Sequence, residues 1–213
     1  MTIIAAADGS ALGNPGPAGW GWYVDDDRWA CGGWPHGTNN MGELTAVLDL
    51  LRATAHVDDD LHILCDSQYV INSVTKWMPG WKAKGWRKGD GKPVLNLDLL
   101  KEIDEAIAGR RYRFEWVKGH IGHVLNEAAD ARARAVAEAY ARGAAIPSGP
   151  GFPGAAPTVV APAETTSNAA ETLFDFDEPA PPPAALTTVQ QRRILNRAKA
   201  DGVSVDVLLD RLL

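Results

Sequence analysis

Four acidic side chains stand at positions where carboxylates can do chemistry. Asp8 and Asp66 each follow a short apolar run, Glu43 precedes the first core leucine of a helical pattern, and Asp130 lies one turn into the last such pattern. Each has an ordinary explanation, because a strand-end Asp often begins a turn and a Glu in a first helical turn complements the helix dipole. Asp130, considered by itself, could lie on a solvated helix face. If the strands that carry Asp8 and Asp66 are parallel neighbours, however, all four carboxylates can converge.

Converging carboxylates repel one another unless cations bind between them. Oxygen ligands select hard ions, so this pattern predicts Mg²⁺, with Mn²⁺ as a substitute. Two such ions about 4 Å apart stabilise the attacking and leaving oxygens of an in-line phosphoryl displacement. The chemistry that these residue types favour is therefore metal-assisted phosphoryl transfer.

The elements that must position these carboxylates can be predicted from periodicity. Apolar runs predict strands at 3–8, 20–24, 29–34, 61–65 and 112–117. Helical spacing predicts helices beginning at Thr38 and Ser67, and others at about 95–108 and 126–141. Three antiparallel strands followed by alternating helix and strand favour an α/β fold, a five-stranded mixed sheet covered by helices.

Several motifs resemble bacterial type 1 ribonuclease H, in the order and at the spacings of that family over essentially all of residues 1–142. They are Asp8-Gly9-Ser10, Gly13-Asn14-Pro15-Gly16-Pro17, Thr38-Asn39-Asn40-Met41-Gly42-Glu43-Leu44, Asp66-Ser67-Gln68-Tyr69-Val70, Trp116-Val117-Lys118-Gly119-His120 and Asn126-Glu127 with Asp130. The resemblance implies the three-layer ribonuclease H fold. It also implies hydrolysis of the RNA strand of RNA:DNA hybrids, leaving 5′-phosphate and 3′-hydroxyl ends.

Carried over by position, the resemblance gives specific residues their roles. Asp8, Glu43, Asp66 and Asp130 would be the metal ligands. His120 would assist proton transfer or product departure, a role that suits an imidazole near neutral pH. Zinc is disfavoured at His120 and His123, because no second ligand pair lies at a suitable spacing.

Amide side chains flank three of the carboxylates. The resemblance assigns Asn14, Asn39 and Gln68 to contacts in the minor groove, where hybrids display 2′-hydroxyl groups. Each amide also has a local explanation: Asn14 can serve a turn, Asn39 can cap a helix and Gln68 can be a solvated first-turn residue. For Asn39 both interpretations can hold together.

A basic stretch rich in tryptophan interrupts an otherwise acidic protein. The chain has a formal net charge of -6, yet residues 76–92 hold six Lys and Arg against Asp90 alone, a local charge of +5. This stretch resembles the basic protrusion that grips the DNA strand in many bacterial members of the family. Packing is the favoured role of Trp77 and Trp81, and Pro79-Gly80 is expected to interrupt the short helix between them. The residues expected to contact substrate are Trp81, Lys82, Lys84, Arg87 and Lys88.

Composition divides the 213 residues into three parts. Residues 1–142 form the expected catalytic domain. Residues 143–185 hold nine of the fourteen prolines and no Lys or Arg, which is typical of a disordered linker. Residues 186–213 are expected to form a helical hairpin whose apolar stripe, with the acidic-aromatic segment 173–178, could engage a protein partner. A chain ending at Arg142 is expected to keep its fold.

Other functions and locations can be weighed from the same residues. No run approaches the roughly 18 apolar residues of a membrane span, and the N-terminus does not resemble a signal peptide, so a cytoplasmic protein is expected. A monomer is expected as well. Cys31 and Cys65 lie in apolar runs and are expected to be buried. The alternatives are a catalytically silent hybrid-binding module, which should lack at least one carboxylate, and a DNA-cutting enzyme of the same fold, which the Thr-Asn-Asn context of Glu43 disfavours.

Overall fold

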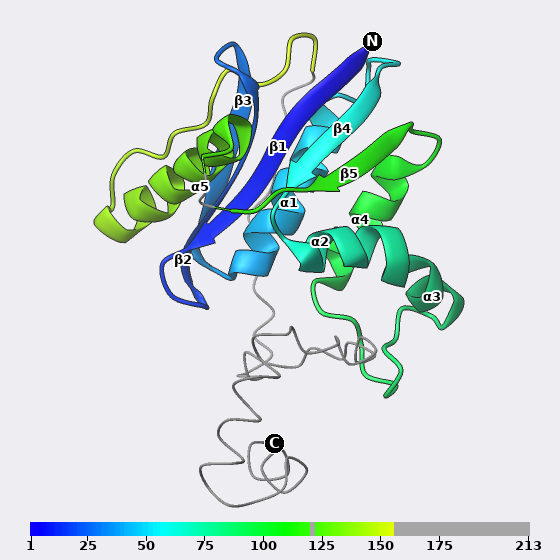
Figure 1. Cartoon of the computed structure of the whole chain (residues 1–213). Coiled ribbons are helices and arrows are strands. Elements are labelled where there is room, and N and C mark those ends of the chain that lie inside the picture. The colour runs from blue at the N-terminus through cyan, green and yellow to red at the C-terminus, as the bar shows by residue number, and fades with distance from the viewer. Residues whose placement is uncertain (120–121, 156–213) are drawn as a thin grey trace, which may run out of the picture. The chain divides into compact units, whose positions relative to one another are not determined.

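A five-stranded mixed sheet organises the protein. The structure, a computed structural model, describes residues 1–119 and 122–155. The strands are β1 (Thr2–Ala11), β2 (Gly16–Asp25), β3 (Arg28–Gly37), β4 (Asp60–Cys65) and β5 (Tyr112–Trp116), in the order β3-β2-β1-β4-β5 (Figure 1). The first three strands pair antiparallel, whereas β4 pairs parallel with both β1 and β5. The expected mixed sheet, with β1 and β4 as parallel neighbours, is confirmed.

Helices cover both faces of this sheet. Helix α1 (Asn39–Ala53) packs on β1 and β2 on one face, with α4 (Leu97–Ile107) against it, and α5 (Val124–Arg142) packs across β1, β2 and β3 on the other face (Figure 1). The main core lies on the α1 face, where the aliphatic side chains of α1 meet Trp20, Trp22 and Ile63. On the α5 face, glycine in β2 permits a close approach: a Cβ at Gly19 would lie 2.1 Å from the carbonyl oxygen of Ala133.

Strand β1 does not end at Asp8 as expected. Its parallel pairing with β4 stops at Ala6↔Leu64, but its antiparallel pairing with β2 continues through Asp8↔Gly21 to Ala11↔Ala18. Asp8 therefore lies inside β1, level with the position that directly follows the last residue of β4. The apolar run could not reveal this, because the later part of β1 is polar and is held by β2.

Helix α1 begins where the sequence predicts, with a different cap. The hydroxyl of Thr38 accepts a hydrogen bond from the backbone N–H of Met41 at 3.2 Å, so Thr38 is the N-cap. Asn39, which could also have capped the helix, is its first residue. Its amide is thereby free to point at another group.

A second helical run carries the basic stretch. It consists of α2 (Gln68–Asn72), a π-helical turn (Ser73–Trp77) and α3 (Met78–Ala83). The expected interruption at Pro79-Gly80 is not found, because the wider π turn, closed by the N–H of Met78 on the carbonyl of Ser73, precedes the proline. Trp77 and Trp81 share a face, with ring centroids 5.7 Å apart, and Trp81 packs against the main core.

Residues 144–155 correct the expected start of the linker. This segment, the strap, runs along the outer edge of β3: Cys31 N–H donates to the carbonyl of Ser148 at 3.0 Å, and Gly151 N–H donates to that of Trp29 at 3.0 Å. Phe152 is buried, with His56 edge-on at a centroid distance of 5.9 Å. Pro and Gly in the strap suit its turns, and backbone hydrogen bonds to an open sheet edge supply order that composition alone does not predict.

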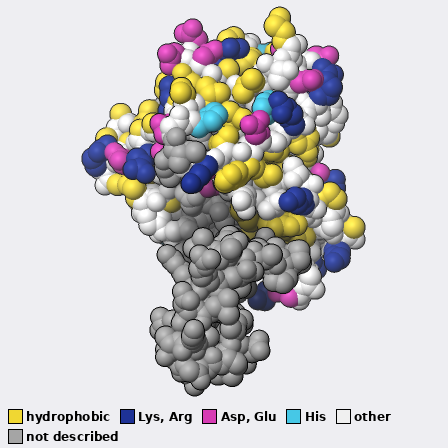
Figure 2. Space-filling view, in the orientation of Figure 1, with side chains coloured by type: hydrophobic (Ala, Val, Ile, Leu, Met, Phe, Trp, Pro, Cys, Tyr) yellow, Lys and Arg dark blue, Asp and Glu magenta, His cyan; other side chains and the backbone are white. Residues whose placement is uncertain are grey.

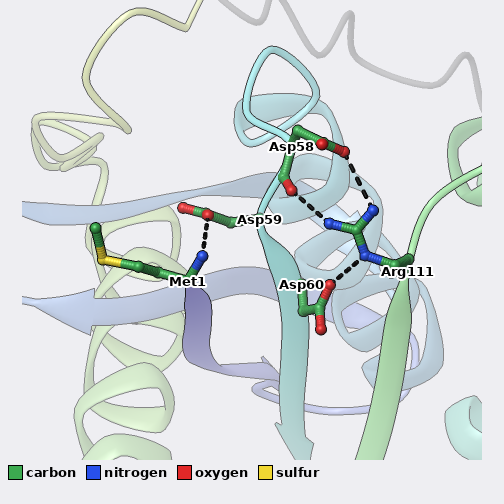
Figure 3. Close-up of polar contacts among 5 residues, drawn as sticks. All are labelled: Met1, Asp58, Asp59, Asp60 and Arg111. Atoms are coloured by element: carbon green, nitrogen blue, oxygen red, sulfur yellow. Dashed lines mark hydrogen bonds and ion pairs between the residues drawn. The ribbon is translucent and has the colours of Figure 1, made fainter.

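Ion pairs join the three parallel strands β1, β4 and β5 at the N-terminal end of β1 (Figure 3). The α-amino group of Met1 contacts Asp59 at 2.7 Å, and the guanidinium of Arg111 binds the carbonyl of Asp58 at 2.6 Å and the carboxylate of Asp60. These contacts link β1 and β5 to the residues that lead into β4. They lie at the end of the parallel strands opposite Asp66.

Cys31 and Cys65 are buried, as expected. His120, the later part of the linker, the acidic-aromatic segment and the helical hairpin lie outside the described residues. Within the described ranges, no helix combines the length and hydrophobicity that a bilayer crossing takes.

Candidate active site

Three of the four predicted carboxylates meet at one point. Asp8 of β1, Glu43 of α1 and Asp66, directly after β4, each offer an oxygen, and these oxygens all lie within 4.8 Å of one another. Asp8 and Glu43 are buried, with relative exposures of 4% and 7%, and Asp66 is half-buried. The convergence predicted from strand order is thus found for three of the four carboxylates.

Glycine contacts bring Glu43 next to Asp8. A Cβ on Gly9 would lie 2.3 Å from the backbone nitrogen of Glu43, and one on Gly42 would lie 2.6 Å from the carbonyl oxygen of Gly19. The first turn of α1 therefore rests directly on the backbones of β1 and β2. Any side chain at Gly9 or Gly42 would push the helix, and with it Glu43, away from Asp8.

A hydrogen bond orients the side chain of Glu43. Asn39 Nδ2 donates to Glu43 Oε1 at 2.6 Å, and the nearby Ser67 hydroxyl favours the ionised form of the same carboxylate. The same Ser67 oxygen caps α2 by accepting from Val70 N–H at 3.3 Å. Glu43 Oε2 is buried and has no hydrogen-bond partner among the described residues.

Asp66 is held by the end of β5, the start of α5 and the connection between them. Asn126 Nδ2 donates to Asp66 Oδ2 at 3.4 Å, and Trp116 Nε1 donates to the backbone oxygen of Asp66 at 3.0 Å. Gly119 crosses so close that a Cβ there would lie 2.3 Å from Asp66 Oδ2. The β5–α5 connection thus packs onto a predicted metal ligand.

Burial and mutual repulsion make ionisation of this cluster costly. Burial, followed by the charges of Asp66 and Glu43, raises the pKa of Asp8 to about 8. Burial also raises the pKa of Glu43 to about 7, with hydrogen bonds from Ser67 and Asn39 opposing the rise. Both carboxylates would be ionised more readily if a positive charge lay among them.

The donor set fits a hard divalent cation. Three carboxylates offer only oxygen, and Glu43 Oε2 is a buried acceptor to which no described residue donates. Leaving such an oxygen unpaired is unfavourable, and a cation would satisfy it. Asp8, Glu43 and Asp66 are the described residues that would hold the ion.

Asp130 stands apart from the group of three. It is half-buried on α5 and is not among the oxygens that lie within 4.8 Å of one another. It is near enough for its charge to contribute to the raised pKa of Asp8. Asp130 therefore borders the cluster.

The three predicted amides lie around the carboxylates in different settings. Asn14 Oδ1 accepts from the backbone N–H of Asn39 at 3.2 Å, which joins the β1–β2 turn to the start of α1. Asn39 contacts Glu43, as described above. Gln68 is exposed at the first position of α2, two residues after Asp66. Among the described residues, Asn39 is the one of the three amides that contacts a predicted metal ligand.

The predicted cations of the basic stretch differ in their pairing. Lys82 pairs with Asp104 of α4 at 2.7 Å, and Arg87 donates to the carbonyl of Gly91 at 2.9 Å. Lys84 is exposed and Lys88 is half-exposed, and neither has an ion pair among the described residues. On the side of the molecule where α3 lies, Lys and Arg side chains are interspersed with hydrophobic ones (Figure 2).

Sequence reasoning gave no role to Ser67, Gly119 or Asn126. Each lies inside a motif that was recognised for another residue, so the motif itself was the available signal. Their contacts with Glu43 and Asp66 depend on which elements meet in space. Spacing along the chain does not specify those contacts.

A mixed five-stranded sheet with helices on both faces, and carboxylates clustered where β1, α1 and the end of β4 meet, defines a ribonuclease H-like fold with an acidic nuclease site. The family model described as RNase H matches residues 2–138. The chain belongs to the bacterial type 1 ribonuclease H family, whose activity is that of a ribonuclease.

Relatives and solved structures agree with this assignment. The chain is 55% identical to Ribonuclease H of Tropheryma whipplei (strain Twist) over 150 residues, which cover 70% of this chain and 93% of that protein. It is 44% identical to Ribonuclease HI of Streptomyces coelicolor over 153 residues, 68% of this chain and 66% of that one.

Among solved structures, LC9-RNase H1, a type 1 RNase H with the type 2 active-site motif, matches with a TM-score of 0.58 and 30% identity. That match covers 71% of this chain and 77% of the other.

Proposed function

We propose that the protein hydrolyses the RNA strand of RNA:DNA hybrids with two Mg²⁺ ions, or Mn²⁺ in their place, leaving 5′-phosphate and 3′-hydroxyl ends. The observation that carries this proposal is the cluster of Asp8, Glu43 and Asp66, in which the buried Glu43 Oε2 has no partner among the described residues. The foamy viral protease-reverse transcriptase, which shares the fold at 20% identity, has a solved structure in complex with an RNA/DNA hybrid.

The reaction adds water across one phosphodiester of the RNA. The oxygen of water bonds to phosphorus, the bond from phosphorus to the 3′-oxygen breaks, and that oxygen takes up a proton. Bound divalent ions would stabilise charge on the attacking and leaving oxygens. Asp8, Glu43 and Asp66 would hold the ions, Asp130 would complete the ligand set from α5, and His120 would carry a proton or assist product departure.

Substrate selection is assigned to groups around the carboxylates. The amides of Asn14, Asn39 and Gln68 would read 2′-hydroxyls in the shallow minor groove of the hybrid. The protrusion at residues 76–92 would bind the DNA strand through phosphate contacts, with Trp81, Lys82, Lys84, Arg87 and Lys88 as its contact residues. Asn39 would serve both tasks, since its side-chain amide already donates to Glu43.

The location, oligomeric state and protein partner are also proposals. We propose a cytoplasmic monomer, with residues 143–185 linking the catalytic unit to a helical hairpin at 186–213 that recruits a protein partner. The strap modifies this assignment, because the linker would begin after Ala155.

Cleavage of end-labelled hybrid, duplex RNA and duplex DNA in Mg²⁺, Mn²⁺ or chelator tests class, substrate and cofactor together. We expect cuts in the RNA of the hybrid only, with either metal and none in chelator. Hybrid binding without cleavage would favour the silent module, and cleavage of duplex DNA would favour a DNA-cutting enzyme of this fold.

A further inference from the structure

Asn126 is a buried polar side chain whose hydrogen bonds are only half used. It is the third residue of α5, is 2% exposed, and donates from Nδ2 to Asp66 Oδ2 at 3.4 Å. Its Oδ1 is also buried and has no partner among the described residues. A buried amide oxygen without a donor is unfavourable, so a group that donates to it is expected when the site is in use.

The chemistry of Asp66 fixes the orientation of this amide. An ionised carboxylate can only accept hydrogen bonds, so the Asn126 NH₂ group must face Asp66. Asn126 Oδ1 is then directed away from that carboxylate. The two halves of the amide therefore have separate tasks.

The position of Asn126 on α5 gives its bond to Asp66 a second consequence. Asn126 and Asp130 are four residues apart, so they lie on the same face of the helix, one turn from each other. Asp130 borders the carboxylate cluster but lies outside the group of three. The Asn126–Asp66 bond thus ties the element that carries the fourth carboxylate to the element that carries the third.

We propose that Asn126 is a positioning residue: its Nδ2 fixes the rotation of the Asp66 carboxylate and the approach of Asp130, and its Oδ1 accepts a hydrogen bond from water held at the carboxylates. The inference rests on the proposed function, since it concerns the same divalent-cation site. Residues that orient metal ligands in this way typically change metal affinity or activity by about 10- to 100-fold when replaced.

Two substitutions separate the hydrogen bond that Asn126 donates from the packing of its side chain. Asn126→Ala removes both halves of the amide. Asn126→Asp keeps the shape but places an acceptor against Asp66. Arg134→Gln is the matched control for Asn126→Asp. Both substitutions make the net charge more negative by one, and Arg134 lies at an exposed position of α5.

Each protein is measured in three ways: Mn²⁺ binding by calorimetric titration without nucleic acid, kcat and KM on hybrid in Mg²⁺, and thermal melting by circular dichroism. We expect Asn126→Ala to bind Mn²⁺ about tenfold more weakly and to lose about tenfold or more in kcat. KM for hybrid should stay within about twofold, because the amide does not lie in the basic protrusion. Asn126→Asp should lose at least as much kcat as Asn126→Ala, and Arg134→Gln should match the unmodified protein.

Unchanged Mn²⁺ affinity and kcat in Asn126→Ala overturn the proposal, as does full kcat in Asn126→Asp. All readings are taken below the melting transition of each variant. If Asn126→Ala does not fold, Asn126→Ser takes its place with the same expected results. Failure of the unmodified protein to cleave hybrid would instead refute the proposed function, so the two failures are distinguishable.

Discussion

Asn39 Nδ2 lies 2.6 Å from Glu43 Oε1, across one turn of α1. The bond joins a residue expected to touch substrate to one expected to hold metal, and it favours the ionised form of a buried carboxylate. The proposed reading of substrate and the proposed binding of metal therefore share the side chain of Asn39.

Replacement of Asn39 by Ala should affect turnover as well as substrate affinity. Loss of this donor raises the pKa of Glu43 further, so the acid limb of the kcat profile should move to higher pH, and kcat near neutral pH should fall by about tenfold. A pH series of single-turnover rates at saturating hybrid measures this. Asn40→Ala, an exposed neighbour of the same type, is the control. A change confined to KM would mean that the bond to Glu43 has no part in catalysis.

Asp66→Asn should abolish cleavage while hybrid binding survives. The change removes a negative charge from the cluster but keeps the shape, so kcat should fall by at least about 10²-fold. Filter binding beside single-turnover cleavage separates the two effects. Near-normal turnover in Mg²⁺ would remove Asp66 from the metal site.

Stability of the metal-free protein should decrease as the pH rises. The pKa values of Asp8 and Glu43, about 8 and about 7, lie above the ordinary values of 3.8 and 4.5. Between about pH 4 and pH 8 the folded state therefore binds more protons than the unfolded state, and each titrating carboxyl can lower stability by up to about 1.4 kcal/mol per pH unit.

Thermal melting in chelator at about pH 5.5 and about pH 8 measures this effect, and the higher melting temperature is expected at the lower pH. Asp8→Asn should shrink the difference, whereas Asp27→Asn, at an exposed position, should not. Mg²⁺ should stabilise the protein more at the higher pH, because the ion binds ionised carboxylates. A melting temperature that rises with pH in chelator would contradict the raised pKa values.

Individual cations of the basic protrusion should contribute unequally to hybrid binding. Replacing Lys84 or Lys88 with Ala should raise KM with little change in kcat and reduce the slope of log Kd against log salt by about 1 each. Lys82, which already pairs with Asp104, should contribute less. Binding at several salt concentrations measures these slopes, and unchanged slopes would identify the stretch as a solvated surface.

The strap should be required for full stability. A chain ending at Ala155 should melt like the whole protein and cleave hybrid equally well. One ending at Arg142 loses the burial of Phe152, worth roughly 1.5–3 kcal/mol, together with the hydrogen bonds to β3, and should melt roughly 5 °C lower or more. Phe152→Ala in the whole protein isolates the contribution of the buried Phe152 side chain to stability. Equal melting of the two truncated chains would show that the strap adds nothing.

Prediction from sequence succeeded where a pattern repeats or a motif is local. Apolar periodicity located the five strands and the main helices, and the order of these elements brought Asp8, Glu43 and Asp66 together. It failed at the end of β1, because polar residues continue that strand through pairing with β2. It also failed at the strap, whose order depends on a sheet edge distant in the chain. The contacts of Ser67 and Asn126 require two elements to be placed in space, so spacing alone could not give them.

Coverage of β3 by the strap leaves β5 as the open edge of the sheet in the described part of the chain. Exposed strand edges are templates for edge-to-edge aggregation, and proteins limit this by keeping such strands short and charged. Strand β5 spans only Tyr112–Trp116 and presents the charged side chains of Arg113 and Glu115, which are 65% and 53% exposed. The ten-residue β3, with its glycines and tryptophans, would be the more hazardous edge, so the strap also protects the enzyme against self-association at high concentration.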